Sequence, residues 1–200
     1  MNIKPLFAVP VGYTYDFIKE RERLELYKSI KSLTHIPHKA LKGNGNSTHG
    51  LDVNFLPTKI KNRIQHAVDE YAQEYGISPV KIDKIWSNIQ DVGSTLHEHT
   101  HQQSLISGAL YINVDETCKL YVHNPNPYVI FTRFNERKHY NFEWYSIDVR
   151  NCQLVLFPSW LMHGRYEHVN TMDNRIVVSL NSGFPRRENS GNVKNTFLWK

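Results

Sequence analysis

Four histidines have the spacing of a metal site built from two strands. His97, His99 and His101 recur at every second residue, and His163 follows a short apolar run much later in the chain. If the first segment is extended, side chains two residues apart point to the same face of a sheet. Two imidazoles of one strand can then bind one ion, and a third ligand from a distant strand leaves coordination positions open. This arrangement is typical of an iron oxygenase rather than of a closed structural site.

Two helices are predicted in the first part of the chain, over residues 16–33 and 58–75. In both segments apolar residues recur at spacings of mostly three and four, which is typical of an amphipathic helix. Pro57 precedes the second segment and Gly76 follows it, as start and stop signals should. Residues 42–50 are rich in glycine, asparagine and serine and predict a flexible loop, the best candidate for a mobile lid.

From about residue 80 onward, short β-rich runs alternate with turn residues. The runs cover residues 81–89, 105–114, 119–123, 128–131, 143–147, 153–157, 165–168 and 175–183. This spacing predicts a β sandwich or barrel. We expect a mainly β fold in one domain over residues 1–200, with residues 1–78 as helical support and residues 79–200 as the β core. Ile176, Val178 and Leu180 alternate along the last run and are expected to line the apolar inner wall.

Composition limits the remaining classes of function. The chain has 200 residues, 40% of them hydrophobic, and a net charge of +5, which suits one globular domain. Its basic residues are scattered, so an anionic substrate stays open and a nucleic-acid partner is not favoured. No apolar run is long enough to span a bilayer, and residues 1–7 lack the apolar run of a secretory signal. Cys118 and Cys152 give no disulfide framework, so we expect a cytoplasmic protein.

Several motifs together resemble those of a family of 2-oxoglutarate- and Fe(II)-dependent oxygenases. That family reads approximately W-x-N, G, H-x-H, S, S-G-x-Y-Y, then F-P-S-W-L-x-H, then R-I-x-x-S-x-N. The matching residues of this chain are Trp86-Ser87-Asn88, Gly93, His99-Thr100-His101, Ser104, Ser107-Gly108, Tyr111, Phe157–His163 and Arg175–Asn181. The resemblance implies a double-stranded β-helix fold, which is a jelly roll of the cupin-like kind.

The resemblance also implies an iron site formed by His99, His101 and His163. His99 matches the first ligand, because Gly93 lies six residues before it, as is common in the wider superfamily. His101 falls where that superfamily usually has an acid. Three neutral imidazoles would raise the net charge at the metal, which favours an anionic chelator such as 2-oxoglutarate. His97 stays open as a ligand in place of His101 or as a residue on the substrate side.

Residues for the co-substrate follow from the same resemblance. Arg175 matches the arginine that binds the far carboxylate of 2-oxoglutarate, and a guanidinium can do so through two parallel hydrogen bonds. Tyr111 follows the pattern of a strand tyrosine that bonds the same carboxylate. Asn88 is a candidate for the pocket, with a hydrogen bond at a strand end as the alternative. Trp160 is a candidate for the substrate side, with core packing as the alternative.

The sequence therefore predicts an Fe(II)- and 2-oxoglutarate-dependent oxygenase that uses O2 to hydroxylate an unknown primary substrate, while 2-oxoglutarate is decarboxylated to succinate. Two alternatives stay open. One is a three-histidine, cupin-like dioxygenase without 2-oxoglutarate, and the other is a non-catalytic binding module. Fold alone does not decide between them. The other histidines are interpreted as structural or exposed: His35, His38, His49, His66, His123, His139 and His168.

Overall fold

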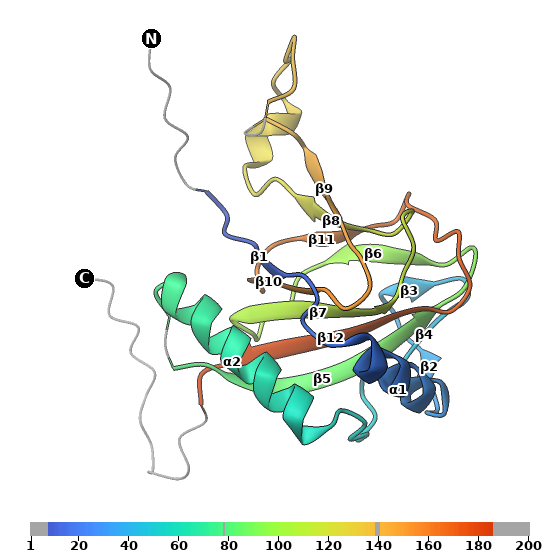
Figure 1. Ribbon diagram of the computed structural model, residues 1–200. Coiled ribbons are helices and arrows are strands. Elements are labelled where there is room, and N and C mark those ends of the chain that lie inside the picture. The colour runs from blue at the N-terminus through green and yellow to red at the C-terminus, as the bar shows by residue number, and fades with distance from the viewer. Residues whose placement is uncertain (1–7, 78, 139–140, 186–200) are drawn as a thin grey trace.

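Two antiparallel sheets face each other in the computed structural model, which describes residues 8–77, 79–138 and 141–185 (Figure 1). The larger sheet has the order β1 (Gly12–Thr14), β10 (Leu154–Pro158), β7 (Ile106–Asn113), β12 (Arg175–Gly183), β5 (Lys81–Gln90), β4 (Gly45–Ser47), β2 (Ile36–Pro37). The smaller sheet has the order β3 (Leu41–Lys42), β6 (Thr95–His99), β11 (His163–Arg165), β8 (Lys119–His123), β9 (Trp144–Asp148). The predicted mainly β architecture is confirmed.

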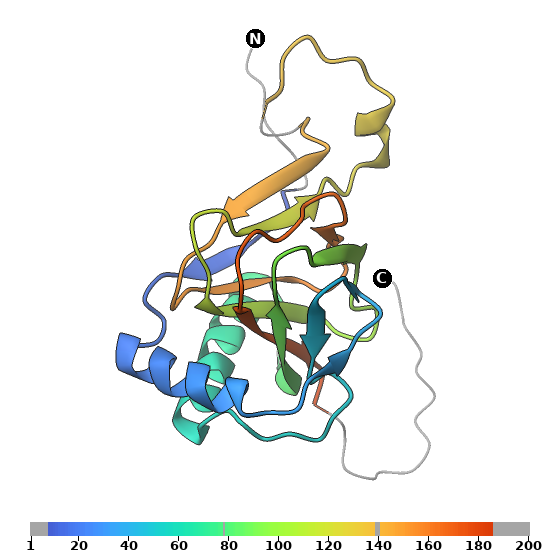
Figure 2. The same cartoon turned by 90° about the vertical axis from the view of Figure 1, so that its right-hand side faces the viewer.

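Both predicted helices are present and cover the outer face of the larger sheet (Figures 1 and 2). α1 (Glu20–Lys31) begins after Lys19, whose backbone N–H donates to Glu22 Oε2 at 2.9 Å. α2 (Thr58–Glu74) begins after Pro57. The apolar stripes of both helices lie in the main core cluster together with residues of β7, β10 and β12. No helix of the described residues is long and apolar enough to cross a membrane.

The apolar residues of β12 lie on the opposite face of the strand from the expected one. Ile176, Val178 and Leu180 lie in the core cluster beneath the helices, so the prediction that they line the inner wall is wrong. Because side chains alternate along a strand, Arg175 and Asn181 face the space between the sheets instead. The alternation of apolar and polar residues shows that the two faces of the strand differ. It does not show which face packs against the helices, and here the apolar face does.

Residues 42–50 are not the flexible loop that their composition predicts. Lys42 ends β3, and Gly45–Ser47 forms β4, which pairs with β5. Gly43 lies in the connection between these strands with φ of +66°, a conformation that glycine adopts without steric penalty. The glycine-rich composition therefore serves a tight connection, and strands from the first part of the chain join both sheets.

Two of the predicted strands are also placed differently. Residues 128–131 overlap a 3-10 helix, η1 (Pro127–Ile130), because Asn126 Oδ1 accepts the Tyr128 N–H at 3.1 Å and caps it. The strand predicted at residues 165–168 lies earlier, as β11. The His168 N–H donates to the Arg165 carbonyl at 3.1 Å, so these residues turn away from the sheet.

Close packing between the strands of the larger sheet generates a prediction at Gly108. A Cβ at this position of β7 would lie 2.6 Å from Leu156 Cδ2 and 3.0 Å from the Val155 carbonyl oxygen. Gly108→Ala should lower the free energy of unfolding by about 1–3 kcal/mol, the usual cost of overpacking, as measured by urea unfolding. Gly183→Ala is the matched control, since its nearest new contact would be at 3.4 Å. Equal stability of the two variants would contradict the packing argument.

Candidate metal centre

Three of the predicted histidines converge where β6 meets β11. His99 ends β6 and lies directly opposite His163, the first residue of β11. His101 follows β6, and its Nε2 lies 3.2 Å from His163 Nε2. One ring nitrogen from each of the three lies within 4.8 Å of the others. Three ligand atoms so placed can hold one metal ion and leave other coordination positions open.

His101 reaches this cluster by a different route from the predicted one. β6 ends at His99, and the His101 backbone N–H donates to the Ser159 carbonyl at 2.9 Å. The chain has therefore left the sheet before His101. The prediction that one strand carries both His99 and His101 is wrong, because a contact with the segment after β10 competes with strand pairing, although the two rings do converge.

Gly164 allows β6 and β11 to approach closely beside the cluster. The register between the two strands shifts after His163, and Gly164 has φ of +91°. A Cβ at Gly164 would lie 2.5 Å from the His97 carbonyl oxygen. Only glycine fits a left-handed conformation against a backbone atom at this distance. This glycine therefore keeps the first residue of β11 opposite the end of β6.

Backbone carbonyls fix the tautomer of two of the three imidazoles. His99 Nδ1 lies 2.7 Å from the His97 carbonyl oxygen, and His163 Nδ1 lies 2.9 Å from the Leu161 carbonyl oxygen. A carbonyl can only accept a hydrogen bond, so each Nδ1 carries the proton of the neutral ring. The Nε2 lone pair of both rings is then free for a metal, as in metal sites whose ligands are oriented by an outer hydrogen bond.

The third imidazole contacts a chain of side chains instead of a carbonyl. His101 Nδ1 lies 3.2 Å from Asn181 Nδ2. Ser107 Oγ donates to Asn181 Oδ1 at 2.9 Å and lies 2.8 Å from Ser159 Oγ. Asn181, Ser107 and Ser159 are all buried. Three residues of the sequence motifs are therefore assembled behind His101.

Burial keeps the imidazoles in the form that binds metals. It lowers the pKa of His163 to about 3 and that of His101 to about 4, with neighbouring imidazoles adding to the effect. Burial also lowers the pKa of His99. All three rings are then neutral at pH 7, and metal binding releases no proton from them. A set of neutral imidazoles with open positions fits a first-row metal such as Fe(II).

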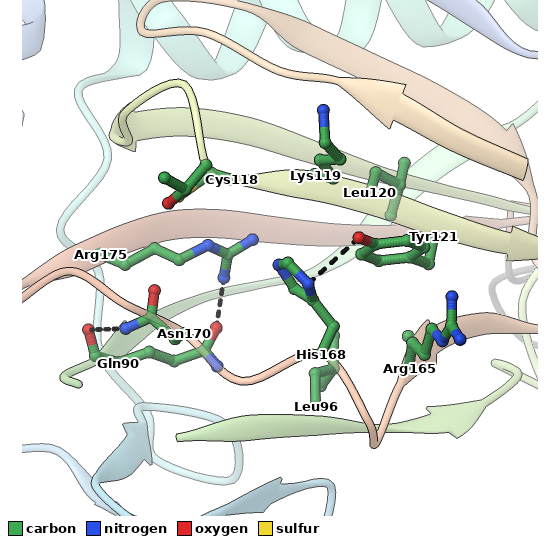
Figure 3. A pocket seen from close by; sticks show the side chains of 12 residues that line it. Gln90, Leu96, Cys118, Lys119, Leu120, Tyr121, Arg165, His168, Asn170 and Arg175 are labelled. Carbon is green, nitrogen blue, oxygen red and sulfur yellow. Dashed lines mark hydrogen bonds between the residues drawn. The ribbon is translucent and has the colours of Figure 1, made fainter. Parts of the chain in front are cut away.

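Figure 3 shows a pocket that is lined by residues of both sheets. Arg175 extends into it from the start of β12 and donates to the Gln90 side-chain oxygen. Gly164, next to the cluster, also lines it. On another wall the Tyr121 hydroxyl lies 3.1 Å from His168 Nδ1. His168, which was interpreted as structural or exposed, is half-buried and lines this pocket.

The lining of this pocket is positive. It contains no carboxylate, and its charged side chains are Lys119, Arg165 and Arg175. Lys119 pairs with Asp148, and Arg165 pairs with Glu167. Within the described residues Arg175 forms no ion pair. A half-buried guanidinium bonded to a neutral amide favours an anionic ligand beside it.

Tyr111 and Asn88 face the same inner space without joining the cluster. Tyr111 is 1% exposed and packs with Cys118 and Leu120, which line the pocket. Burial raises its pKa, so the phenol keeps its proton. The Asn88 side chain donates to Ser179 Oγ at 3.1 Å across the sheet. A role for either residue in binding 2-oxoglutarate stays a prediction.

His97 and Trp160 lie away from the three converging rings. His97 is not one of the clustered histidines, and its ring centroid lies 4.7 Å from that of Tyr166. Trp160 is 49% exposed, and its indole N–H donates to the Tyr75 hydroxyl at 3.1 Å. Core packing therefore does not explain Trp160. Contact of either residue with a substrate stays a prediction.

A second group of rings beside the cluster escaped the sequence analysis. The ring centroid of Trp86 lies 5.8 Å from that of His101 and 5.0 Å from that of His49. His38 packs on His49 with 4.8 Å between centroids. We call His38, His49 and Trp86 the aromatic wall. Isolated histidines carry no spacing signal, and these meet the site because β2, β4 and β5 are adjacent.

Comparison with known proteins gives one family. A family profile described as "Putative 2OG-Fe(II) oxygenase" matches residues 84–181. This stretch runs from β5 nearly to the end of β12 and contains the motifs quoted from the sequence. The resemblance predicted from those motifs is confirmed. A search of curated proteins finds no match.

Solved structures of low sequence identity share the fold. HygX from Streptomyces hygroscopicus, with nickel and 2-oxoglutarate bound, is 9% identical over 88% of this chain and 83% of that chain, with a TM-score of 0.58. A Pseudomonas putida prolyl-4-hydroxylase is 14% identical over 90% and 94%, with a TM-score of 0.57. The viral collagen prolyl hydroxylase of Paramecium Bursaria Chlorella virus-1 is 13% identical over 86% and 94%, with a TM-score of 0.57. The predicted double-stranded β-helix fold is confirmed.

The cluster predicts a ranking of Fe(II) affinities among histidine variants. His101→Ala and His163→Ala each remove a converging nitrogen, and the loss of affinity should exceed the about 10–100-fold cost of losing a supporting hydrogen bond. His97→Ala should stay close to the unmodified protein, because His97 is not one of the clustered rings. Anaerobic Fe(II) titration measures the ranking. A larger loss for His97→Ala than for His101→Ala would move the site to His97 and His99.

Proposed function

We propose that this chain, whose residues 84–181 match the profile of a 2-oxoglutarate–Fe(II) oxygenase family, uses Fe(II) and 2-oxoglutarate to hydroxylate a C–H bond at an iron held by His99, His101 and His163. The observation that carries the proposal is the convergence of these rings. In the nearby pocket, which reaches Gly164, Arg175 has no carboxylate partner within the described residues. Bound iron supplies the activation of O2, coupled to oxidation of 2-oxoglutarate to succinate and CO2.

The charge of the ligand set supports a chelating co-substrate. Imidazoles are neutral, whereas the usual carboxylate ligand would cancel one charge of the metal. The metal therefore keeps its full positive charge, which strengthens its attraction for an anionic chelator. His163 is buried, and His99 and His101 are half-buried, so the protein limits the access of water from their side of the site.

Arg175 is our candidate for the far carboxylate of 2-oxoglutarate. Its planar guanidinium can bind a carboxylate through two parallel hydrogen bonds. Gln90 holds the side chain from one side, and the pocket extends from Arg175 to Gly164, next to the metal cluster. Lys119 and Arg165 are already paired with carboxylates. Arg175 is therefore the best-placed lining cation to receive a new anion.

Arg175→Lys tests this assignment. Lysine keeps the charge but loses the planar fork, so 2-oxoglutarate affinity should fall at least about tenfold, or about 1.4 kcal/mol, while Fe(II) binding persists. Anaerobic titration of the Fe(II) protein with 2-oxoglutarate, followed by the visible charge-transfer band, measures the change. Arg165→Lys is the control, because Arg165 lines the same pocket but pairs with Glu167.

The same titration of the unmodified protein distinguishes a 2-oxoglutarate-dependent oxygenase from a three-histidine dioxygenase that does not use 2-oxoglutarate. No charge-transfer band with Fe(II) demonstrably bound would remove the 2-oxoglutarate mechanism and favour the three-histidine dioxygenase. A normal band combined with equal affinities in both arginine variants would keep the mechanism and remove Arg175 as the anchor.

On the other side of the cluster, we propose that the primary substrate is anionic and contacts the aromatic wall. After burial, the groups that lower the pKa of His49 are Lys84, His38 and Lys39, and His49 titrates at about 4. Lys39 and Lys84 are both exposed. Only basic groups thus act on the wall. Flat rings beside exposed ammonium groups suit a substrate that combines a planar apolar part with a negative charge.

Phenyl phosphate is a suitable probe of this surface. With Zn(II) bound and 2-oxoglutarate saturating the other pocket, Lys84→Gln should weaken phenyl phosphate binding severalfold, consistent with about 1 kcal/mol for a partly exposed charge. Calorimetry measures the affinity, and neutral phenol should bind more weakly than phenyl phosphate. Lys81→Gln is the control, since Lys81 is exposed on the same strand. Equal binding by both lysine variants would remove the anionic substrate class.

Two broader expectations stay proposals. We propose that residues 1–200 form one domain, which is supported by β1 to β4 joining the two sheets. We also propose a reducing, cytoplasmic compartment, because Cys118 and Cys152 are both buried and free.

A further inference from the structure

His101 differs from the other two clustered histidines in the partner of its Nδ1. His99 and His163 meet carbonyls, which only accept. His101 meets Asn181, whose amide has a donor end and an acceptor end. Here the donor Nδ2 faces His101 at 3.2 Å, so His101 Nδ1 accepts and the proton of the neutral ring lies on Nε2.

The contact between His101 and His163 agrees with that tautomer. Their Nε2 atoms lie 3.2 Å apart, and His163 carries its proton on Nδ1, which faces the Leu161 carbonyl. His163 Nε2 can therefore only accept, and His101 Nε2 donates to it. The hydrogen bonds of the described residues thus define one consistent set of proton positions for the three rings.

Binding a metal requires the opposite tautomer of His101. A ring nitrogen that carries a proton has no lone pair for a metal, so Nε2 has to lose its proton and Nδ1 has to gain one. Nδ1–H then needs an acceptor. Asn181 supplies it if its side-chain amide turns by half a revolution, which brings Oδ1 toward the ring.

Ser107 and Ser159 allow this reversal without the loss of the hydrogen bonds along the chain. Ser107 Oγ now donates to Asn181 Oδ1 at 2.9 Å. With the amide reversed, Ser107 Oγ would accept from Asn181 Nδ2 and donate to Ser159 Oγ, 2.8 Å away. A hydroxyl can do both. Because Ser107 is 1% and Ser159 0% exposed, a lost bond would not be replaced by bulk water and would cost free energy.

We propose that Asn181, Ser107 and Ser159 form a positioning relay that supports both tautomers of His101 and holds Nδ1–H when metal binds. The inference rests on the proposed role of His101 as a ligand. It gives a purpose to three motif residues that are not themselves metal ligands. Asn181 acts only through His101, so it is a positioning residue and not a catalytic one.

Zn(II), which is diamagnetic, is the probe for the test. Nitrogen-15 NMR should place the His101 proton on Nε2 in the metal-free protein and on Nδ1 in the Zn(II) protein. Asn181→Leu removes the partner and should weaken Zn(II) binding by about 10–100-fold, the usual effect of losing an outer hydrogen bond. Ser107→Ala leaves the reversed amide without an acceptor and should weaken binding in the same direction.

Asn181→Asp gives the result that a purely structural role would not. A carboxylate only accepts, so the proton of His101 should lie on Nδ1 even without metal, and Zn(II) affinity should be kept or raised. Asn113→Leu is the control, because its amide donates to the Asn174 carbonyl at 2.8 Å on the same sheet and does not contact the cluster. It should change stability without changing Zn(II) affinity.

The outcomes separate this inference from the proposed function. If Zn(II) leaves the His101 tautomer unchanged and His101→Ala keeps its affinity, His101 is not a ligand and both ideas fail. If Zn(II) moves the proton but Asn181→Leu and Asn181→Asp bind Zn(II) as the unmodified protein does, only the relay fails. If Asn181→Leu does not fold, the position of the His101 proton in the Asn181→Asp variant still tests the relay.

Discussion

The pairing of β6 with β11 is the constraint on which the site depends. It sets His99 opposite His163, although many residues separate them in the chain, and it persists only because Gly164 lets the two backbones approach closely. A side chain at Gly164 would push the strands apart and separate two of the three imidazoles. Both rings are then locked by carbonyls of their own strand or of the turn before it. The geometry of two nitrogens is thus fixed by the backbone, before any metal contributes.

The larger sheet separates stability from chemistry by its two faces. Its outer face carries the larger of the two apolar core clusters, together with α1 and α2. Its inner face can therefore hold a row of polar side chains that a core would not tolerate, with hydrogen bonds from Asn88 to Ser179, from Arg175 to Gln90 and from Ser107 to Asn181. Each of these six polar side chains has a hydrogen-bond partner in the row, which limits the cost of placing it there.

The sequence predicted the parts of this arrangement that leave a local pattern. His99, His163 and Arg175 stand in motifs, and the helices show their period. The inner face of β12 could not be predicted, because alternation does not say which face meets the helices. The path of His101 depends on a contact with Ser159, and His38 and His49 arrive through short strands that resemble a loop in composition. These features arise from contacts between distant segments, which periodicity does not record.

The absence of a carboxylate from the converging set changes the electrostatics of the whole site. Two positive regions flank it within the described residues, around Arg175 on one side and around Lys39 and Lys84 on the other. With a divalent cation added between them, repulsion from these two regions would oppose metal binding, and the negative charge of Glu98, which acts on His99, would offset only part of it. An anionic co-substrate cancels that repulsion, since it touches both the metal and Arg175 in the proposed arrangement. Metal and co-substrate should therefore strengthen each other's binding, and by linkage each does so by the same factor. A carboxylate ligand would weaken this coupling, because it would neutralise part of the metal charge in advance.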